Sequence, residues 1–361
     1  MSSPGGHAAG AGGSAPAGPV MGGGGPGRGT ELVPEVGPDA GASKPGSEGE
    51  PSTVGRGHGS GEEPATGAIP PGAATESAGA GPEAAPPGAA GAAGPAGPAG
   101  VVPIERIPGG HLAGWIRRAD FALLPLASLE WHGPHMPLGT DLILARGLAE
   151  RLRGDFTALL FPPFVYTACP GKTRHYPGTV ALRAEVALAA LCDVLRGILD
   201  AGFVRVLLLN AHDANMAIAR AAAEAVTGER RASILLVNWW QMVTPEETAG
   251  MFRGAPGEAR PGRGHGGPFE ASATAALAPE SVDPALAPEL PPRRPPEAGR
   301  PYVLVESNPE PWAGYAGFVR DTSLRTGEFI VERTLEHLER LVAAWLRAPL
   351  PGDPPGRSRD G

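Results

Sequence analysis

The fold is decided by the stretch from Phe121 to Asp141, which reads FALLPLASLEWHGPHMPLGTD. Its first seven residues, Phe121 to Ala127, are apolar and predict a β-strand. The next fourteen residues predict a Gly- and Pro-containing loop that carries Glu130, His132 and Asp141. Functional side chains are often found on loops that a rigid scaffold positions. The stretch therefore predicts a strand whose end delivers polar side chains to a site.

These three side chains predict a metal site. Glu130 and His132 are two residues apart, so they point the same way if that stretch is extended. Carboxylate and neutral imidazole together suit Zn²⁺, Mn²⁺ or Fe²⁺. The alternative is a polar loop with ordinary surface residues, because single His or Glu residues near strand ends are common.

The composition separates the start of the chain from a folded domain. Residues 1–100 contain 66 Gly, Ala or Pro residues and no apolar residues at helix or strand spacing. Such a segment buries too little surface to offset its ordering entropy, so we expect disorder there. Residues 101–348 are long enough for one α/β domain with a filled core. We expect residues 349–361 to be a disordered tail.

Charge and hydropathy exclude several classes of protein. Nine acidic and three basic residues in residues 1–100 account for most of the formal net charge of −8. The remainder is nearly neutral, so no nucleic-acid surface is expected. The chain shows no 18-residue apolar run and no secretory signal, so we expect a cytoplasmic protein without a membrane contact. Cys169 and Cys192 are expected to be reduced, without a disulfide or a Cys-based metal site.

Strand-like runs alternate with segments of helical period, which is typical of βαβ units around a largely parallel sheet with helices on both faces. Besides the first strand, strands are predicted at 158–165, 203–209, 234–237 and 302–305. Helices are predicted at 142–153, 184–201, 215–226, 270–277 and 327–346. The Pro- and Arg-containing stretch 279–300 is predicted to be a surface loop.

Two further histidines lie where strands or loops lead into helices. His212 follows the strand that ends at Leu209, although Asn210 and Asp213 there could simply cap the next helix. His265 lies among glycines and precedes Glu270 by five residues, and a helix cap is again the plain alternative. The carboxyl ends of parallel strands form the reactive edge of such a sheet. We therefore expect these groups to meet the first cluster.

Other candidates are weaker. His175 lies in a loop and is as compatible with packing or solvation as with substrate contact. Trp239 and Trp240 follow a strand end and can wall a pocket, but aromatic residues in this position are more often part of the core. His337 lies in the last helix and is expected on its solvated face.

Together these clusters resemble the creatininase (creatinine amidohydrolase) family. Its Glu-x-His-Gly-x-His-x-Pro-Leu-x-Thr-Asp run is similar to Glu130–Asp141, and its Asn-Gly-His-x-x-Asn turn to Asn210–Asn215. Its His-Ala-Gly-x-x-Glu-Thr-Ser stretch is similar to His265–Ser272, and its His…Phe-Pro-Gly-Thr loop to His175–Thr179. The order and separation of all four motifs agree across residues 102–347.

The resemblance implies a three-layer α/β/α sandwich with a mostly parallel central sheet, and a homo-oligomer. It also implies two divalent metal ions per subunit, zinc and/or manganese or iron, and hydrolysis of a carbon–nitrogen amide bond other than a peptide bond. By the same resemblance, Glu130 and His212 would hold one metal and His132 the other. Asp141 would bridge both.

This chain departs from the family pattern at several positions. Creatininases proper have a further carboxylate where this chain has Ala214, which argues against creatinine as the substrate. Glu270 is the first candidate to replace that ligand, and Asp213 is the second. Further departures are Ala211, Trp131, Pro268 and Ala271.

The resemblance leaves the substrate and the exact activity open. Under it, His265 would donate a proton to the departing nitrogen, and Glu270 would bind metal or orient the attacking water. The expected substrate is a small-molecule amide, cyclic amide or formamide. A family peptidase that trims a peptide-derived cofactor precursor and a non-catalytic binding protein are alternatives. A metallophosphoesterase is disfavoured because no Gly-rich phosphate loop accompanies the motifs.

Overall fold

The computed structural model describes residues 100–169, 173–254, 258, 260–290 and 313–352. They contain one sheet of five parallel strands, in the order β1-β3-β2-β4-β5. The strands are β1 (Gly100–Pro103), β2 (Phe121–Leu126), β3 (Thr157–Leu160), β4 (Arg205–Asn210) and β5 (Ser233–Asn238). Leu126 pairs with Asn210, which pairs with Asn238, so β2, β4 and β5 end at the same level.

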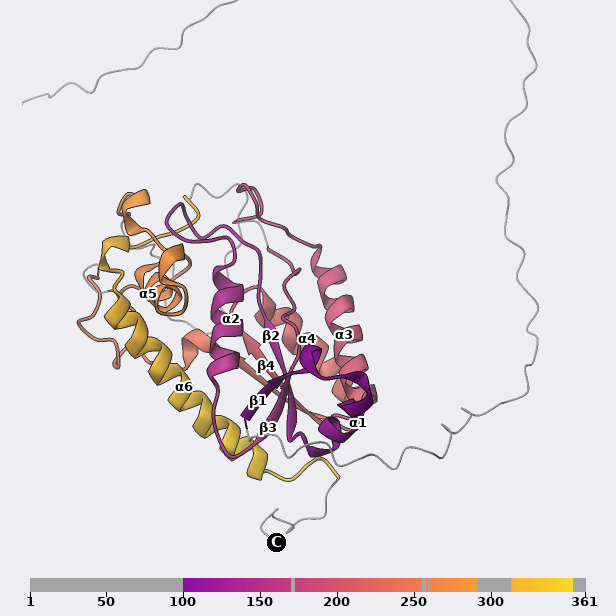
Figure 1. Ribbon diagram of the computed structural model, residues 1–361. Coiled ribbons are helices and arrows are strands. Elements are labelled where there is room, and N and C mark those ends of the chain that lie inside the picture. The colour runs from indigo at the N-terminus through magenta and orange to yellow at the C-terminus, as the bar shows by residue number, and fades with distance from the viewer. Residues whose placement is uncertain (1–99, 170–172, 255–257, 259, 291–312, 353–361) are drawn as a thin grey trace, which may run out of the picture. The chain divides into compact units, whose positions relative to one another are not determined.

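Helices cover both faces of this sheet (Figure 1). One face is covered by α1 (Gly109–Arg118), α3 (Ala184–Asp200) and α4 (Asn215–Glu229). The other is covered by α2 (Thr140–Arg151), α5 (Pro268–Leu277) and α6 (Leu324–Arg347). Short 3₁₀ turns are η1 (Ile104–Arg106), η2 (Trp239–Gln241), η3 (Pro279–Ser281), η4 (Pro284–Leu286) and η5 (Val319–Asp321). The protein is a three-layer α/β/α sandwich.

The central strands are buried on both faces, which explains why their sequences are continuously apolar. In β2, Phe121 and Leu123 pack with α2 and α6, whereas Ala122 and Leu124 pack with α3 and α4. All six residues of β2 and all six of β4 are buried. These two strands are therefore a rigid support for whatever follows their carboxyl ends.

The structure confirms four of the predicted strands and all five predicted helices, each with small shifts at the ends. The prediction of a strand to Val165 was too long, because β3 ends at Leu160 and Pro162 and Pro163 cannot donate hydrogen bonds to a strand ladder. Residues 302–305, 1–99 and 353–361 lie outside the described residues, so the strand predicted at 302–305 and most of the expected disordered segments 1–100 and 349–361 stay predictions. Gly100, the last residue of the first segment, is the first residue of β1.

Sequence reasoning missed β1 and α1. β1 follows the Gly-, Ala- and Pro-rich segment and ends in Pro103, which is tolerated because β1 is an edge strand. α1 begins with Gly109 and Gly110, which are poor helix formers. Among the helices that the structure describes, none combines the length and the apolar composition needed to cross a bilayer.

Candidate metal centre

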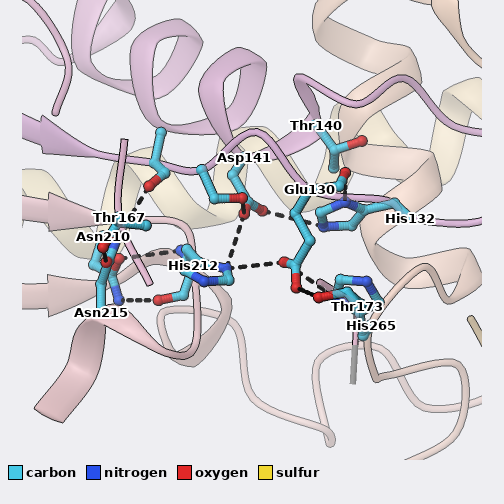
Figure 2. A network of polar contacts seen from close by, with 12 residues as sticks. Glu130, His132, Thr140, Asp141, Thr167, Thr173, Asn210, His212, Asn215 and His265 are labelled. Atoms are coloured by element: carbon cyan, nitrogen blue, oxygen red, sulfur yellow. Dashed lines mark hydrogen bonds and ion pairs between the residues drawn. The ribbon is translucent and has the colours of Figure 1, made fainter. Parts of the chain in front are cut away.

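The polar groups singled out in the sequence meet beyond the carboxyl ends of β2 and β4 (Figure 2). Glu130 and His132 lie in the loop after β2, and Asp141 lies in the first turn of α2. His212 lies in the loop after β4. His265 lies in the loop before α5, and Glu270 lies in the first turn of α5. Each belongs to at least one group whose possible ligand atoms lie within 4.8 Å of one another.

Asp141 lies between two histidines. Its Oδ1 is 3.3 Å from His132 Nε2, and its Oδ2 is 3.1 Å from His212 Nδ1. The Ser128 hydroxyl donates a 2.6 Å hydrogen bond to Oδ2, and Asp141 is 1% exposed. The first turn of a helix also favours a negative charge. Asp141 is thus fixed with one oxygen turned toward each imidazole.

Glu130 approaches the same nitrogen of His212 as Asp141 does. Its Oε2 is 3.0 Å from His212 Nδ1 and 3.8 Å from His265 Nδ1. The Thr173 hydroxyl donates a hydrogen bond to Oε1. Oε2 is buried and makes no hydrogen bond to any described residue. An unsatisfied buried carboxylate oxygen is costly, so this atom requires a cation or a proton.

Glu270 closes the cluster from α5. Its Oε2 lies 3.9 Å from His132 Nε2 and accepts a 2.7 Å hydrogen bond from the Gly266 amide. Gly266 has a φ of +62°, and a Cβ there would lie 2.7 Å from the His132 carbonyl oxygen. Glycine at this position therefore lets the loop before α5 approach the loop after β2.

All three histidines are oriented by main-chain carbonyl groups. His132 Nδ1–H donates to Glu130 O at 2.9 Å, and His212 Nε2–H donates to Ala168 O at 3.0 Å. His265 Nε2–H donates to Trp131 O at 2.7 Å. In each ring the second nitrogen is then turned toward the cluster. Such outer contacts fix the tautomer and orientation of metal-binding histidines.

At four of these six groups, neighbouring charges shift the pKa more than burial does. Burial would raise the pKa of Glu130, but His265 and His212 lower it to about 2. Burial would lower the pKa of His132, but the neighbouring carboxylates, Asp141 first, raise it to about 10. Burial is likewise outweighed at Asp141, whose pKa falls, and at His212, whose pKa rises.

Burial dominates at the two remaining groups. It raises the pKa of Glu270 to about 7. Burial, with the charge of His132, lowers the pKa of His265 to about 4. Without a cation, protons on His132 and His212 compensate the buried carboxylates. The buried carboxylates of the cluster therefore need positive charge beside them.

The donor set fits divalent metal ions. One group of possible ligands is His132, Asp141 and Glu270, and two others are centred on Glu130. Imidazole and carboxylate together suit zinc, manganese and iron. Such an ion would bind the unsatisfied Glu130 Oε2 and the acceptor nitrogens that are turned toward the carboxylates.

The structure separates the two candidates for the missing carboxylate. Asp213 is exposed, whereas Glu270 lies in the cluster. The alternative that Asn210 and Asp213 cap α4 is wrong, because the helix begins after Ala214 without a side-chain cap. Glu270 accepts a hydrogen bond from the Gly266 amide just before α5, so the alternative that this segment caps the helix holds in part.

The weaker candidates lie outside this cluster. His175 is exposed, and Trp239 is buried in the core with Trp240 packed against it. The expectation that His337 is solvated was wrong, because it is half-buried and contacts the Met242 carbonyl and Glu247.

Sequence reasoning also missed three residues of the site. Ser128 and Thr173 support carboxylates, and Cys169 belongs to a possible ligand group with Glu130 and His212. The last finding differs from the expectation of no Cys-containing metal site. Cys169 follows β3 in a segment without periodic pattern, so no local signal pointed to it.

Comparisons with known proteins agree with the fold. The Creatininase family model, described as creatinine amidohydrolase, matches residues 111–342. A creatinine amidohydrolase from Pseudomonas putida is 29% identical over 227 residues, which cover 58% of this chain and 84% of that protein. A mycofactocin precursor peptide peptidase from Mycobacterium ulcerans is 34% identical over 118 residues, covering 30% of this chain and 46% of that protein.

A solved structure described as "Creatininase Mn" superimposes with a TM-score of 0.58 at 22% identity. The superposition covers 70% of this chain and 100% of the other. At this level of identity the likeness shows a shared three-layer fold.

Proposed function

The chain belongs to the creatininase family, and from this premise we propose that it is a divalent-metal-dependent hydrolase that cleaves a carbon–nitrogen amide bond. The observation that carries the proposal is the position of Asp141. One of its oxygens faces His132 and the other faces His212, so this carboxylate can serve two neighbouring metal positions.

The remaining ligands divide between these two positions. Glu130 and His212 would complete the first, because Glu130 Oε2 is 3.0 Å from His212 Nδ1. His132 and Glu270 would complete the second, because Glu270 Oε2 is 3.9 Å from His132 Nε2. When bound, a pair of divalent ions lowers the pKa of water and polarises a carbonyl oxygen. Zinc, manganese and iron all suit these donors.

His265 is placed to move a proton. Its Nε2–H is held by Trp131 O, so Nδ1 faces the cluster, 3.8 Å from Glu130 Oε2. Burial keeps the pKa of His265 low, so the ring enters the reaction neutral and accepts a proton as water attacks. It then donates this proton to the departing nitrogen. Glu270, with its pKa raised by burial, is the second group able to orient the attacking water.

The substrate class is a small amide, a cyclic amide or a formamide. The Pseudomonas putida relative is a creatinine amidohydrolase, but Ala214 and Trp131 differ from the pattern of creatininases proper and argue against creatinine itself. A peptide-derived cofactor precursor is the second candidate. The Mycobacterium ulcerans peptidase, at 34% identity over part of the chain, favours it.

Metal analysis together with a substrate panel tests the proposal. We expect the purified full chain to bind about two divalent ions. It should hydrolyse a member of a panel of amides, cyclic amides, formamides and short peptides with zinc, manganese or iron added. Glu130→Ala should lose metal and activity together, whereas Glu224→Ala, an exposed carboxylate on α4, should keep both. A wild-type chain that binds no metal under any of these conditions contradicts the proposal and leaves the non-catalytic alternative.

Assembly as a homo-oligomer and a cytoplasmic location remain predictions. Sedimentation of the purified chain and fractionation of the source cells would test them.

A further inference from the structure

Cys169 is buried beside the metal-ligand cluster. It lies in the loop after β3 and is 2% exposed. Its sulfur, a nitrogen of His212 and an oxygen of Glu130 lie within 4.8 Å of one another. The second cysteine, Cys192, instead packs among apolar residues of α3 and makes a matched comparison.

The loop that carries Cys169 is fixed to the same site. The carbonyl of Ala168, the preceding residue, accepts the hydrogen bond from His212 Nε2. The Thr167 hydroxyl donates a 2.6 Å hydrogen bond to Asn215, in the first turn of α4 (Figure 2). The hydrogen bond from His212 to the carbonyl of the residue before Cys169 therefore fixes the imidazole relative to the thiol.

A second observation points to a ligand at this place. Glu130 Oε2 is buried, faces His212 Nδ1 at 3.0 Å and makes no hydrogen bond to any described residue. With Nε2–H donated to Ala168 O, Nδ1 of neutral His212 is also an acceptor. Two acceptors that face each other in a buried place repel unless a cation or a proton lies with them. The thiol of Cys169 adds a third donor atom to that pair.

The donor types differ between the two sides of the cluster. The side formed by His132, Asp141 and Glu270 offers only nitrogen and oxygen, which zinc and manganese both accept. The side formed by Glu130 and His212 adds sulfur. A thiolate is a soft ligand that favours zinc, whereas manganese prefers oxygen.

We propose that Cys169 is a thiolate ligand at the metal position of Glu130 and His212, and that it makes this position selective for zinc over manganese. The inference rests on the proposed metal-dependent function. On binding, the thiol loses its proton to solvent and the sulfur lone pair forms the bond to the ion, so no oxidant or reductant is needed.

Cobalt substitution tests the sulfur bond. We expect the Co²⁺-loaded full chain to show the near-ultraviolet charge-transfer absorption of a thiolate–cobalt bond. Cys192→Ser should keep that absorption, and Cys169→Ser should lose it while still binding cobalt. In competition with a chelator, Cys169→Ser should also lower the ratio of zinc to manganese affinity by about tenfold or more.

X-ray absorption on the zinc-loaded wild type gives a test that does not depend on any variant. A sulfur neighbour at about 2.3 Å beside nitrogen and oxygen neighbours near about 2.0–2.1 Å is the expected result. Metal binding without a sulfur neighbour overturns the role of Cys169 and leaves the proposed function intact. A chain that binds neither zinc nor cobalt overturns both.

Discussion

The Ser128 hydroxyl donates a 2.6 Å hydrogen bond to Asp141 Oδ2, and both side chains are buried. The same oxygen lies 3.1 Å from His212 Nδ1. Ser128 therefore fixes the rotation of the carboxylate that we propose to be shared by the two metal positions.

Ser128→Ala should lower metal affinity by about 10- to 100-fold, because outer contacts of this kind orient the ligand. Titration with a metal-binding dye measures it. Ser272→Ala is the control, since Ser272 is an equally buried serine that accepts a hydrogen bond from the Ser323 amide, outside the cluster. That variant should lose about 1 kcal/mol of stability and bind metal normally. Equal metal affinities of the two variants would count against the role of Ser128.

Glu270→Gln and Asp213→Asn test which carboxylate takes the place that Ala214 leaves vacant. Glu270 lies 3.9 Å from His132, whereas Asp213 is exposed. We expect Glu270→Gln to lose about half of the bound metal, because one of two positions loses a charged ligand. Asp213→Asn should retain all of it. Atomic emission on the purified variants gives the stoichiometry, and the reverse result would assign the ligand to Asp213.

His265→Ala should keep its metal and lose turnover by about 10²- to 10⁴-fold, the usual contribution of a general acid–base group. The ring is held by Trp131 O and belongs to a possible ligand group with Glu130 and His132. Metal analysis alongside kcat therefore separates the two roles. Loss of metal in this variant would make His265 a ligand. His175→Ala, an exposed histidine, is the control and should change neither quantity.

The metal-free protein should become less stable as the pH rises. The pKa of His132 is raised from 6.5 to about 10, so its stabilising contribution is complete below about pH 6.5 and is lost on approaching pH 10. His212 acts in the same direction. Glu270, with its pKa raised from 4.5 to about 7, adds a further loss of stability between pH 4.5 and about pH 7. Once the imidazoles lose their protons, the buried carboxylates lack compensation.

Thermal unfolding of the chelator-treated protein between pH 6.5 and about pH 9.5 measures this effect. The metal-loaded protein should show a much smaller change over the same range, because cations replace the protons and bind deprotonated ligands better. A metal-free protein whose melting temperature rises over this range would contradict the prediction.

Gly327→Ala should destabilise the fold by about 1–3 kcal/mol or more, because the α5–α6 contact is overpacked by a single methyl group. A Cβ at Gly327 would lie 1.9 Å from the Ser272 carbonyl oxygen. Gly197→Ala is the control, since a Cβ at this exposed position of α3 meets nothing within 4 Å. It should stabilise the protein by about 0.5–1 kcal/mol. Urea unfolding of both variants measures the difference, and equal effects would refute the packing argument.

The sequence was sufficient for the parts of the site that are local in the chain. Glu130, His132 and Asp141 lie within twelve residues, and His212 follows the neighbouring strand in the sheet. Because parallel strands end at one edge, their convergence could be predicted. Glu270 could be noted from its place five residues after His265, but its role as a replacement ligand came only from the family resemblance. The long segment between Asn238, the end of β5, and Pro268, the start of α5, has no strand pattern that would place it.

The supporting contacts could not be predicted. Thr173 and Glu130 are 43 residues apart, and Thr173 lies in a loop that has no periodic pattern. Nothing in the sequence around Cys169 marks it as a ligand, and only the folded chain brings it close to His212. Such contacts depend on where a loop returns across the sheet, which neither propensity nor hydrophobic period encodes.

The carbonyl oxygens that orient the three imidazoles have one more consequence. An amide carbonyl is present whichever amino acid occupies the position, so replacing the side chain of Trp131 or Ala168 leaves the acceptor for the neighbouring ring in place. Substitution at either position therefore leaves the acceptor that orients the neighbouring ring unchanged. The ring of Trp131, which stacks on Tyr176, can thus be exchanged for another side chain while its carbonyl group still holds His265.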